Sequence, residues 1–148
     1  MNMKIRPIGI VKNNVTEPQD AEWGKVVSEI VINKEYQQAL YQIEGFSHII
    51  VLYWMSRIST AKRSVLKVHP RGRKDLPLVG VFATRSQMRP NPIGLTTVKV
   101  LECHGNVIKV TGLDAINGTP VLDIKPYIPE HDSPARVKIP PWVKKLRE

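Results

Sequence analysis

The stretch "TTVKVLECHGNVIKVT" at Thr96–Thr111 decides the fold class. Thr96–Cys103 and Val107–Thr111 are two strand-like runs, and they flank His104-Gly105-Asn106. A short connection that contains Asn and Gly between two such runs is typical of a β-hairpin. The stretch therefore predicts a pair of antiparallel strands.

Further strand-like runs lie on both sides of this hairpin. They are Lys4–Lys12, Val26–Ile32, His48–Met55, Ser64–Val68 and Val121–Lys125. The run from His48 is continuously apolar, which predicts a strand buried on both faces. Only Lys34–Ile43 has a helical pattern, with Gly45 as its stop.

Many short strands with one helix indicate a mainly β fold, and we expect a small single-sheet β-barrel with one short helix. The glycines never fall as G-x-G, so a Rossmann-type dinucleotide site is excluded. A chain of 148 residues predicts one domain, 1–148. Its last part, roughly 128–148, is an irregular, proline-rich and basic C-terminal arm, either for docking or frayed.

The rest of the composition excludes several classes of protein. One cysteine leaves no disulfide framework within the chain, and the four histidines lack metal-ligand spacing, so we assign no metal. The sequence has no signal peptide and no apolar run of membrane-spanning length. We therefore expect a cytoplasmic protein with no membrane partner.

The charge points to a partner. The chain has 22 Lys and Arg against 13 Asp and Glu, a net charge of +9, which favours a polyanion such as nucleic acid. The loop "HPRGRKDLP" at His69–Pro77 offers Arg71, Arg73 and Lys74. It is either a phosphate-contacting loop or an ordinary solvated one.

Polar groups crowd the stretch "GVFATRSQMRPNPIGL" at Gly80–Leu95. Pro90 and Pro92 bias Arg89 and Asn91 toward extended backbone, so residues 89–92 form a stiff segment. A proline cannot donate to a strand ladder, and nearby carbonyl groups are then open to a ligand. This segment suits a small polar ligand, although a plain turn with solvated charges is the alternative.

A second polar group lies in "NGTPVLDIKPY" at Asn117–Tyr127. Asn117-Gly118 is a turn signal, and the turn would present backbone groups beside Thr119. Asp123 and Lys125 lie two apart in a strand and share a face. They form either an ordinary salt bridge or part of a catalytic site.

These two stretches, with "GFSHIIVLYW" at Gly45–Trp54, resemble the TsaA/TrmO family over nearly the whole chain. The resemblance implies a non-Rossmann β-barrel that binds S-adenosylmethionine, usually as a homodimer with the cofactor near the interface. It also implies a tRNA partner. Characterised members methylate N6 of threonylcarbamoyladenosine, the modified adenosine 3′ of the anticodon.

Carried over by position, the resemblance implies a set of cofactor-binding residues. They are Arg85, Leu95, Asn117, Gly118, Thr119, Pro120, Val121, Ser56 and Arg57, with Pro18 and Gln19 matched more loosely. Asn117 replaces an aspartate common in the family, and Ser56-Arg57 stands where better-known bacterial members carry His-Gln.

Within this resemblance we assign roles in catalysis and RNA binding. Asp123 is the candidate acceptor of the proton that leaves the target nitrogen, and Lys125 orients Asp123 or the threonyl carboxylate. The residues expected to bind phosphates of the anticodon loop are Arg71, Arg73, Lys74 and Arg89.

Three alternatives remain open on the sequence. The first is a non-catalytic RNA-binding β-barrel, which would bind tRNA but no S-adenosylmethionine. The second is a methyltransferase of the knotted type acting on another RNA position, although the strand-rich C-terminal half lacks the parallel βα core it needs. The third is a methyltransferase of small molecules.

Overall fold

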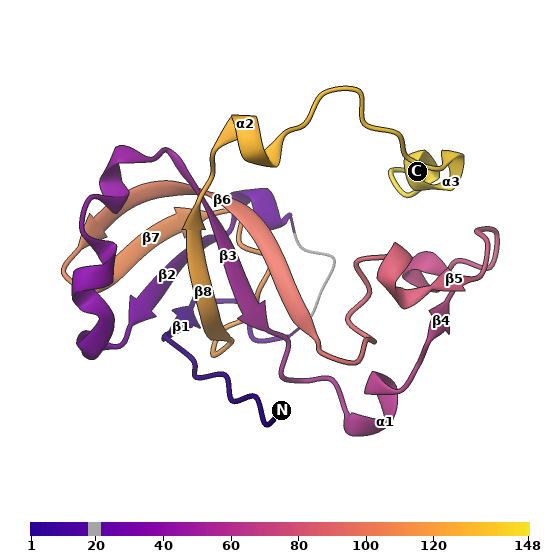
Figure 1. Ribbon diagram of the computed structural model, residues 1–148, viewed down its shortest axis with the longest axis horizontal. Coiled ribbons are helices and arrows are strands. Elements are labelled where there is room, and N and C mark those ends of the chain that lie inside the picture. Colours follow the sequence, from indigo (N-terminus) through magenta and orange to yellow (C-terminus); the bar gives the residue numbers. More distant parts are fainter. Residues whose placement is uncertain (18–21) are drawn as a thin grey trace. The chain divides into compact units, whose positions relative to one another are not determined.

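The computed structural model describes residues 1–17 and 22–148, so Pro18 and Gln19 lie outside the described residues. Its main feature is a closed barrel with the strand order β1-β2-β7-β6-β3-β8 (Figure 1). The strands are β1 (Gly9–Lys12), β2 (Val27–Ile32), β3 (His48–Trp54), β6 (Ile93–His104), β7 (Val107–Thr111) and β8 (Pro120–Pro126). The prediction of a mainly β barrel is confirmed.

Every neighbouring pair in the barrel is antiparallel. The predicted hairpin joins β6 to β7, with His104 opposite Val107, and Gly105 in its turn has a φ of +60°. That positive φ favours glycine, because a side chain would be strained there. The barrel closes where Gly9 of β1 pairs with Val121 of β8.

The core lies inside the barrel and follows from alternation along the strands. In β3, Ile49, Val51 and Tyr53 are buried, whereas the residues between them are only half-buried. The expectation that this strand is buried on both faces is therefore wrong. A closed antiparallel barrel fills one face of each strand and leaves the other at the surface.

A close contact between β3 and β6 fixes their register. Gly94 of β6 lies opposite Tyr53 of β3, and the ring of Tyr53 occupies the space that a side chain at position 94 would need. The Tyr53 hydroxyl lies 2.9 Å from the hydroxyl of Thr96. The glycine of the Pro-Ile-Gly sequence is thus required by packing inside the barrel.

The chain forms two compact units. The barrel unit comprises Met1–Ser56 and Ile93–Tyr127, and the second unit comprises Arg57–Pro92 and Ile128–Glu148. The second unit contains α1 (Thr60–Arg63), β4 (Lys67–Val68), β5 (Val79–Gly80), α2 (Pro129–Asp132) and α3 (Pro141–Lys145). Its β4 and β5 pair as a separate two-stranded sheet.

Several predicted boundaries are corrected. The first strand begins at Gly9 rather than Lys4, and the strand expected from Thr96 already begins at Ile93. The run expected from Ser64 gives only Lys67–Val68. The arm at 128–148 is less irregular than expected, since it contains α2 and α3.

The helical pattern at 34–43 is also different in detail. The segment forms two 3-10 helices, Lys34–Leu40 and Ile43–Gly45, in place of one α-helix. The break falls at Gln42, which has a φ of +72°, whereas Gly45 ends the second turn. Among the residues that the structure describes, no helix is long and apolar enough to cross a membrane.

Candidate functional site

The polar stretch before β6 is held together by its own hydrogen bonds. The guanidinium of Arg89 donates to the carbonyl oxygens of Thr84 (3.2 Å), Ser86 (3.1 Å) and Val81 (3.3 Å). The hydroxyl of Thr84 accepts from the backbone N–H of Ser86, and the hydroxyl of Ser86 accepts from that of Met88. Arg89 therefore stabilises the loop from within. The sequence predicts only a contact of Arg89 with RNA phosphates.

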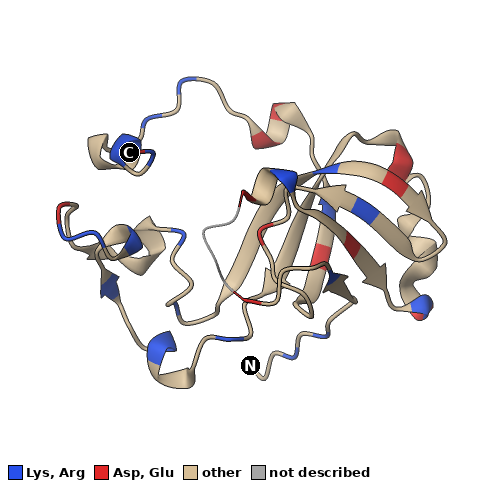
Figure 2. Ribbon diagram, turned by 180° about the vertical axis from the view of Figure 1, so that it is seen from behind, with Lys and Arg blue, Asp and Glu red and all other residues tan. Residues whose placement is uncertain are grey.

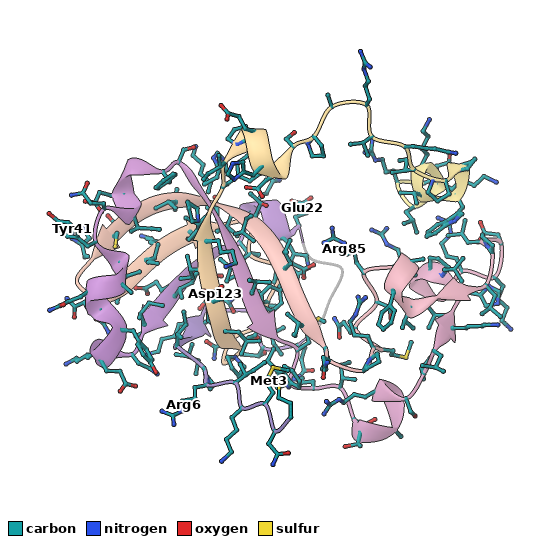
Figure 3. The ribbon with its side chains drawn as sticks, in the orientation of Figure 1. Met3, Arg6, Glu22, Tyr41, Arg85 and Asp123 are labelled. Carbon is teal, nitrogen blue, oxygen red and sulfur yellow. The ribbon has the colours of Figure 1, made fainter. Side chains whose placement is uncertain are left out.

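This bracing presents Arg85 at the surface. Arg85 lies between Thr84 and Ser86, whose carbonyls Arg89 binds, and its own side chain is exposed (Figure 3). Its guanidinium has five N–H donors in a planar fork, which matches a carboxylate. The braced loop thus presents the exposed side chain of Arg85 from a pre-ordered backbone.

The corner at Asn117 lies in the barrel unit and is anchored by Asn13. The side-chain oxygen of Asn117 accepts from the backbone N–H of Asn13 at 3.1 Å. The side-chain amide of Asn13 donates to the Ala115 carbonyl (2.8 Å) and to the buried Ser28 hydroxyl (2.9 Å). This network fixes the loop that enters β8.

The backbone of the corner is used unequally. The N–H groups of Asn117, Gly118 and Thr119 donate to the carbonyls of Val15, Val11 and Ile116. Within the described part of the chain, no hydrogen bond reaches the carbonyl oxygens of Asn117 and Gly118, and both residues are exposed. The corner therefore offers acceptors to a ligand and no donors from these three amides.

The side chains of Thr119 and Val121 have structural positions. Thr119 is 5% exposed and its hydroxyl donates to the Ile116 carbonyl at 2.7 Å. Val121 lies in the barrel core. Their part in cofactor binding stays a prediction, and any contact would come from the backbone.

Asp123 and Lys125 share a face of β8 as the alternation of the strand predicted. The Nζ atom of Lys125 lies 3.1 Å from Oδ2 of Asp123, and the N–H of Ile124 donates to Oδ1 of Asp123 at 2.9 Å. The side chain of Lys125 is 62% exposed and that of Asp123 is 48% exposed, so water screens this ion pair. The pair keeps a carboxylate in a fixed position on the barrel (Figure 3).

The strand register places Asp123 in one row with Leu95. Asp123 of β8 lies opposite Leu52 of β3, which lies opposite Leu95 of β6. Residues opposite each other in antiparallel strands point to the same face. With about 4.8 Å between strands, the backbones at 123 and 95 are about 10 Å apart across the outer surface of the barrel.

The basic loop at 69–77 contacts the C-terminal helix. Arg71 Nη1 donates to the carbonyl of Leu146 and Arg73 Nη1 to that of Lys145, both at 2.8 Å. Arg73 also forms a forked pair with Asp75, at 3.1 and 2.7 Å, and this hydrogen bonding lowers the pKa of the Asp75 carboxyl. Two of the arginines expected to bind phosphates therefore hold α3.

The remaining candidates are more scattered. Ser56 is exposed at the end of the first segment of the barrel unit, and Arg57 begins the second unit. Among residues 1–17 and 22–148, no group of three or more His, Cys, Asp or Glu is arranged to hold a metal ion. Burial raises the pKa of the Cys103 thiol, which favours its neutral, weakly nucleophilic form.

Two positioning residues escaped the sequence analysis. Asn13 anchors the Asn117 corner, and Arg63 Nε donates to the Pro90 carbonyl at 2.9 Å. Asn13 follows directly after β1, where a polar side chain commonly bonds the backbone of a turn. No local pattern marks Arg63 for its bond, because the Pro90 carbonyl lies 27 residues away.

With this geometry in place, comparisons with known proteins decide the family. The sequence pattern of the tRNA-methyltransferase O N-terminal domain matches residues 10–133 of the chain. The chain belongs to the tRNA-methyltransferase O N-terminal domain family. The family predicted from the sequence motifs is thereby confirmed.

Individual relatives of this tRNA-methyltransferase O family agree. An S-adenosyl-L-methionine-binding protein of Archaeoglobus fulgidus is 48% identical over 134 residues, which cover 88% of this chain and 93% of that protein. A human tRNA (adenine(37)-N6)-methyltransferase is 43% identical over 106 residues, 70% of this chain and 23% of that protein.

A solved structure shows the same fold. The crystal structure of TrmO from Pseudomonas aeruginosa matches with a TM-score of 0.74 and 28% identity. The match covers 93% of this chain and 62% of the TrmO chain. The chain thus spans less than two thirds of that longer protein.

Proposed function

We propose that this chain is an S-adenosylmethionine-dependent methyltransferase that acts on N6 of threonylcarbamoyladenosine next to the tRNA anticodon. The observation that carries the proposal is the family match over residues 10–133. It is supported by a relative named for S-adenosylmethionine binding and by another named for methylation of adenine N6 in tRNA.

The residues of the described structure fit S-adenosylmethionine chemically. In the second unit, taken by itself, the exposed guanidinium of Arg85 suits a carboxylate such as the one S-adenosylmethionine carries. In the barrel unit, taken by itself, the open carbonyl oxygens of Asn117 and Gly118 suit an amino group such as that of adenine. The bracing of Arg85 by Arg89 lowers the entropy cost of ordering this loop on binding.

When bound, S-adenosylmethionine supplies a sulfonium-activated methyl group, whose bond to sulfur breaks as its bond to N6 forms. The lone pair on the carbamoylated N6 is delocalised, so the nitrogen is a weak nucleophile and its proton must leave. The protein's contribution is therefore positioning together with proton acceptance.

Asp123 is the proposed proton acceptor. Its Oδ1 is fixed by the N–H of Ile124 and its Oδ2 by Lys125. Lys125 would also attract the threonyl carboxylate of the substrate, because its ammonium is 62% exposed. Leu95, in the same row of the outer surface, offers an apolar contact nearby.

Titration calorimetry with S-adenosylmethionine and turnover on tRNA test this proposal. In Asp123→Asn we expect turnover to fall at least 100-fold, since an amide accepts no proton, with the Kd for S-adenosylmethionine changed less than about twofold. Glu102→Gln is the matched control, because Glu102 is an exposed carboxylate on β6 and should leave turnover unchanged. Unchanged turnover in Asp123→Asn would remove Asp123 from this role.

The same measurements separate the alternative functions. Binding of tRNA without binding of S-adenosylmethionine would indicate a non-catalytic RNA-binding barrel. Turnover of free nucleoside as fast as of intact tRNA would indicate a methyltransferase of small molecules. Methylation of another nucleotide of the tRNA would indicate a methyltransferase that uses the same cofactor on a different RNA position.

A homodimer and a cytoplasmic location belong to the same proposal. The outer face of the barrel exposes Ile93 (36%) and Leu95 (46%) beside half-buried Leu52, a surface that a second copy could cover. Analytical ultracentrifugation should then give twice the mass of the chain, and Leu95→Glu should shift it to the monomer. A substrate tRNA would be met in the cytoplasm.

A further inference from the structure

The net charge of the chain is confined to one of its two units. The second unit holds 14 of the 22 Lys and Arg but only 4 of the 13 Asp and Glu, a net charge of +10. The barrel unit holds the other 8 basic and 9 acidic residues, a net charge of −1. In Figure 2 the second unit is accordingly mostly blue where it is charged, whereas the barrel carries both colours.

Within this unit, the loop 69–75 is shaped to hold α3. Arg71 has a φ of +54° and Gly72 a φ of +66°, a left-handed pair that turns the loop sharply. A hydrogen bond from His69 Nδ1 to the Leu76 carbonyl, at 2.9 Å, closes the loop. From this loop, Arg71 and Arg73 donate to the carbonyls of Leu146 and Lys145 at the end of α3.

Beside these two arginines, other basic side chains of the same unit are exposed to solvent. The end of a helix has carbonyl groups without partners, and cationic side chains commonly satisfy them. Here Arg71 satisfies the Leu146 carbonyl, and Arg73 adds a bond to the Lys145 carbonyl, which also accepts from the N–H of Glu148. Asp75 is already paired with Arg73. The basic residues next to them are all exposed: Lys74, Lys144, Lys145 and Arg147.

We propose that the loop 69–75 and the C-terminal segment 141–148 form one surface that binds RNA phosphates. In this surface Arg71 and Arg73 are positioning residues that hold α3, while Lys74, Lys144, Lys145 and Arg147 contact the phosphates. The inference rests on the proposed tRNA substrate and names the part of the chain that holds it.

Charge and shape favour RNA over a membrane surface. The surface formed by 69–75 and 141–148 has six basic residues against Asp75 and Glu148. Its helix α3 is five residues long, with Trp142 and Val143 half-buried. An interfacial helix needs an exposed apolar face to insert, and this helix presents mainly lysines. Phosphate contacts need only such exposed cations.

The test measures tRNA binding to the full chain at several salt concentrations. The readout is the fluorescence anisotropy of a labelled tRNA. The variant removes three charges of the C-terminal segment, Lys144→Gln, Lys145→Gln and Arg147→Gln. The matched control removes three exposed lysines of the barrel unit, Lys12→Gln, Lys34→Gln and Lys99→Gln. Both variants lower the net charge of the chain equally.

We expect the C-terminal variant to bind tRNA roughly 10- to 100-fold more weakly at 0.1 M salt. Its slope of log K against log salt should be about 2 to 3 smaller, since each lost phosphate contact removes about 0.7 to 0.9. The barrel control should keep the slope of the unmodified chain. Equal losses of tRNA affinity in the two variants would overturn the inference, because the net charge of the chain, and not the position of the charges, would then determine binding.

The positioning role has its own readout. Arg71→Gln should weaken tRNA binding in the unmodified chain but have no further effect in the C-terminal variant, and it should speed hydrogen exchange in residues 144–148. Additive losses would mean that Arg71 itself contacts a phosphate, which contradicts the assigned role.

A failure of this inference can be told from a failure of the proposed function. Calorimetry with S-adenosylmethionine on the same preparations reports the cofactor site alone. If the chain binds the cofactor but its affinity for tRNA does not change when the C-terminal charges are removed, only this inference is wrong. Binding to anionic phospholipid vesicles through these charges, without binding to tRNA, would overturn it in favour of a membrane.

Discussion

The guanidinium of Arg89 lies 3.1 Å from the carbonyl oxygen of Ser86, and it bonds two further carbonyls of the same loop. The sequence predicts an RNA contact at this position, and that contact stays a prediction; the structure shows the side chain in three hydrogen bonds within its own loop. The arginine that stays exposed is Arg85, one residue before Ser86. A charged residue of the loop thus shapes the site from within.

Replacing Arg89 with Ala should therefore impair cofactor binding without removing a cofactor contact. Bonds to a charged group contribute about 1.5 to 3 kcal/mol each, and water would replace part of them, so we expect a loss of about 2 kcal/mol in the stability of the loop. Calorimetry should show weaker binding of S-adenosylmethionine, and the amides of Ser86 and Met88 should exchange faster. A variant with unchanged amide exchange would contradict the bracing role.

Asn13→Ala should destabilise the barrel by about 2 kcal/mol, because it leaves the buried Ser28 hydroxyl and the Val15 N–H without their partner. Denaturant unfolding measures this free energy. Asn14→Ala is the matched control, since Asn14 is exposed beside it, and it should change stability by less than about 0.5 kcal/mol. Equal effects of the two substitutions would argue against the anchor.

Gly94→Ala should cost about 3 kcal/mol of stability, since the new methyl group would overlap the ring of Tyr53. A control is Gly45→Ala, where a Cβ atom meets nothing within 4 Å. Combining Gly94→Ala with Tyr53→Leu should recover part of the loss, because the smaller side chain frees the space. The thermal midpoints of the three variants check this, and a Gly94→Ala protein as stable as the parent would refute the packing.

Asp114→Asn should stabilise the chain at neutral pH. Partial desolvation raises the pKa of the Asp114 carboxyl above its ordinary value of 3.8, so the folded state binds this proton more tightly than the unfolded state. The effect on stability should be small, because the residue is exposed and water screens its charge. Its contribution to stability is then present below pH 3.8 and is lost as the pH rises through the raised pKa. The free energy of unfolding against pH should show a gain for Asp114→Asn at pH 7 that vanishes in acid. The same gain at both pH values would exclude this cause.

The sequence predicted those features that depend on local pattern. The hairpin at Gly105, the strand pair Asp123 and Lys125 and the Asn117 turn all follow from short-range spacing. The family followed from three motifs in order, which a single motif could not have established.

Features that depend on partners far along the chain escaped prediction. Arg71 and Arg73 contact carbonyls 75 and 72 residues away, and no local pattern marks an arginine for such a bond. The closure of the barrel likewise sets which face of β3 is buried, so its apolar run looked like a fully buried strand. Long-range pairing decided these points, and spacing in the sequence carries little of it.

Mass spectrometry of tRNA nucleosides can show whether the chain transfers a methyl group to N6 of threonylcarbamoyladenosine. The purified chain is incubated with S-adenosylmethionine carrying a labelled methyl group and with tRNA that contains this nucleoside. We expect the label on N6 of that nucleoside, and its loss in Asp123→Asn. A chain that binds both ligands and leaves the nucleoside unmethylated would not have the proposed activity.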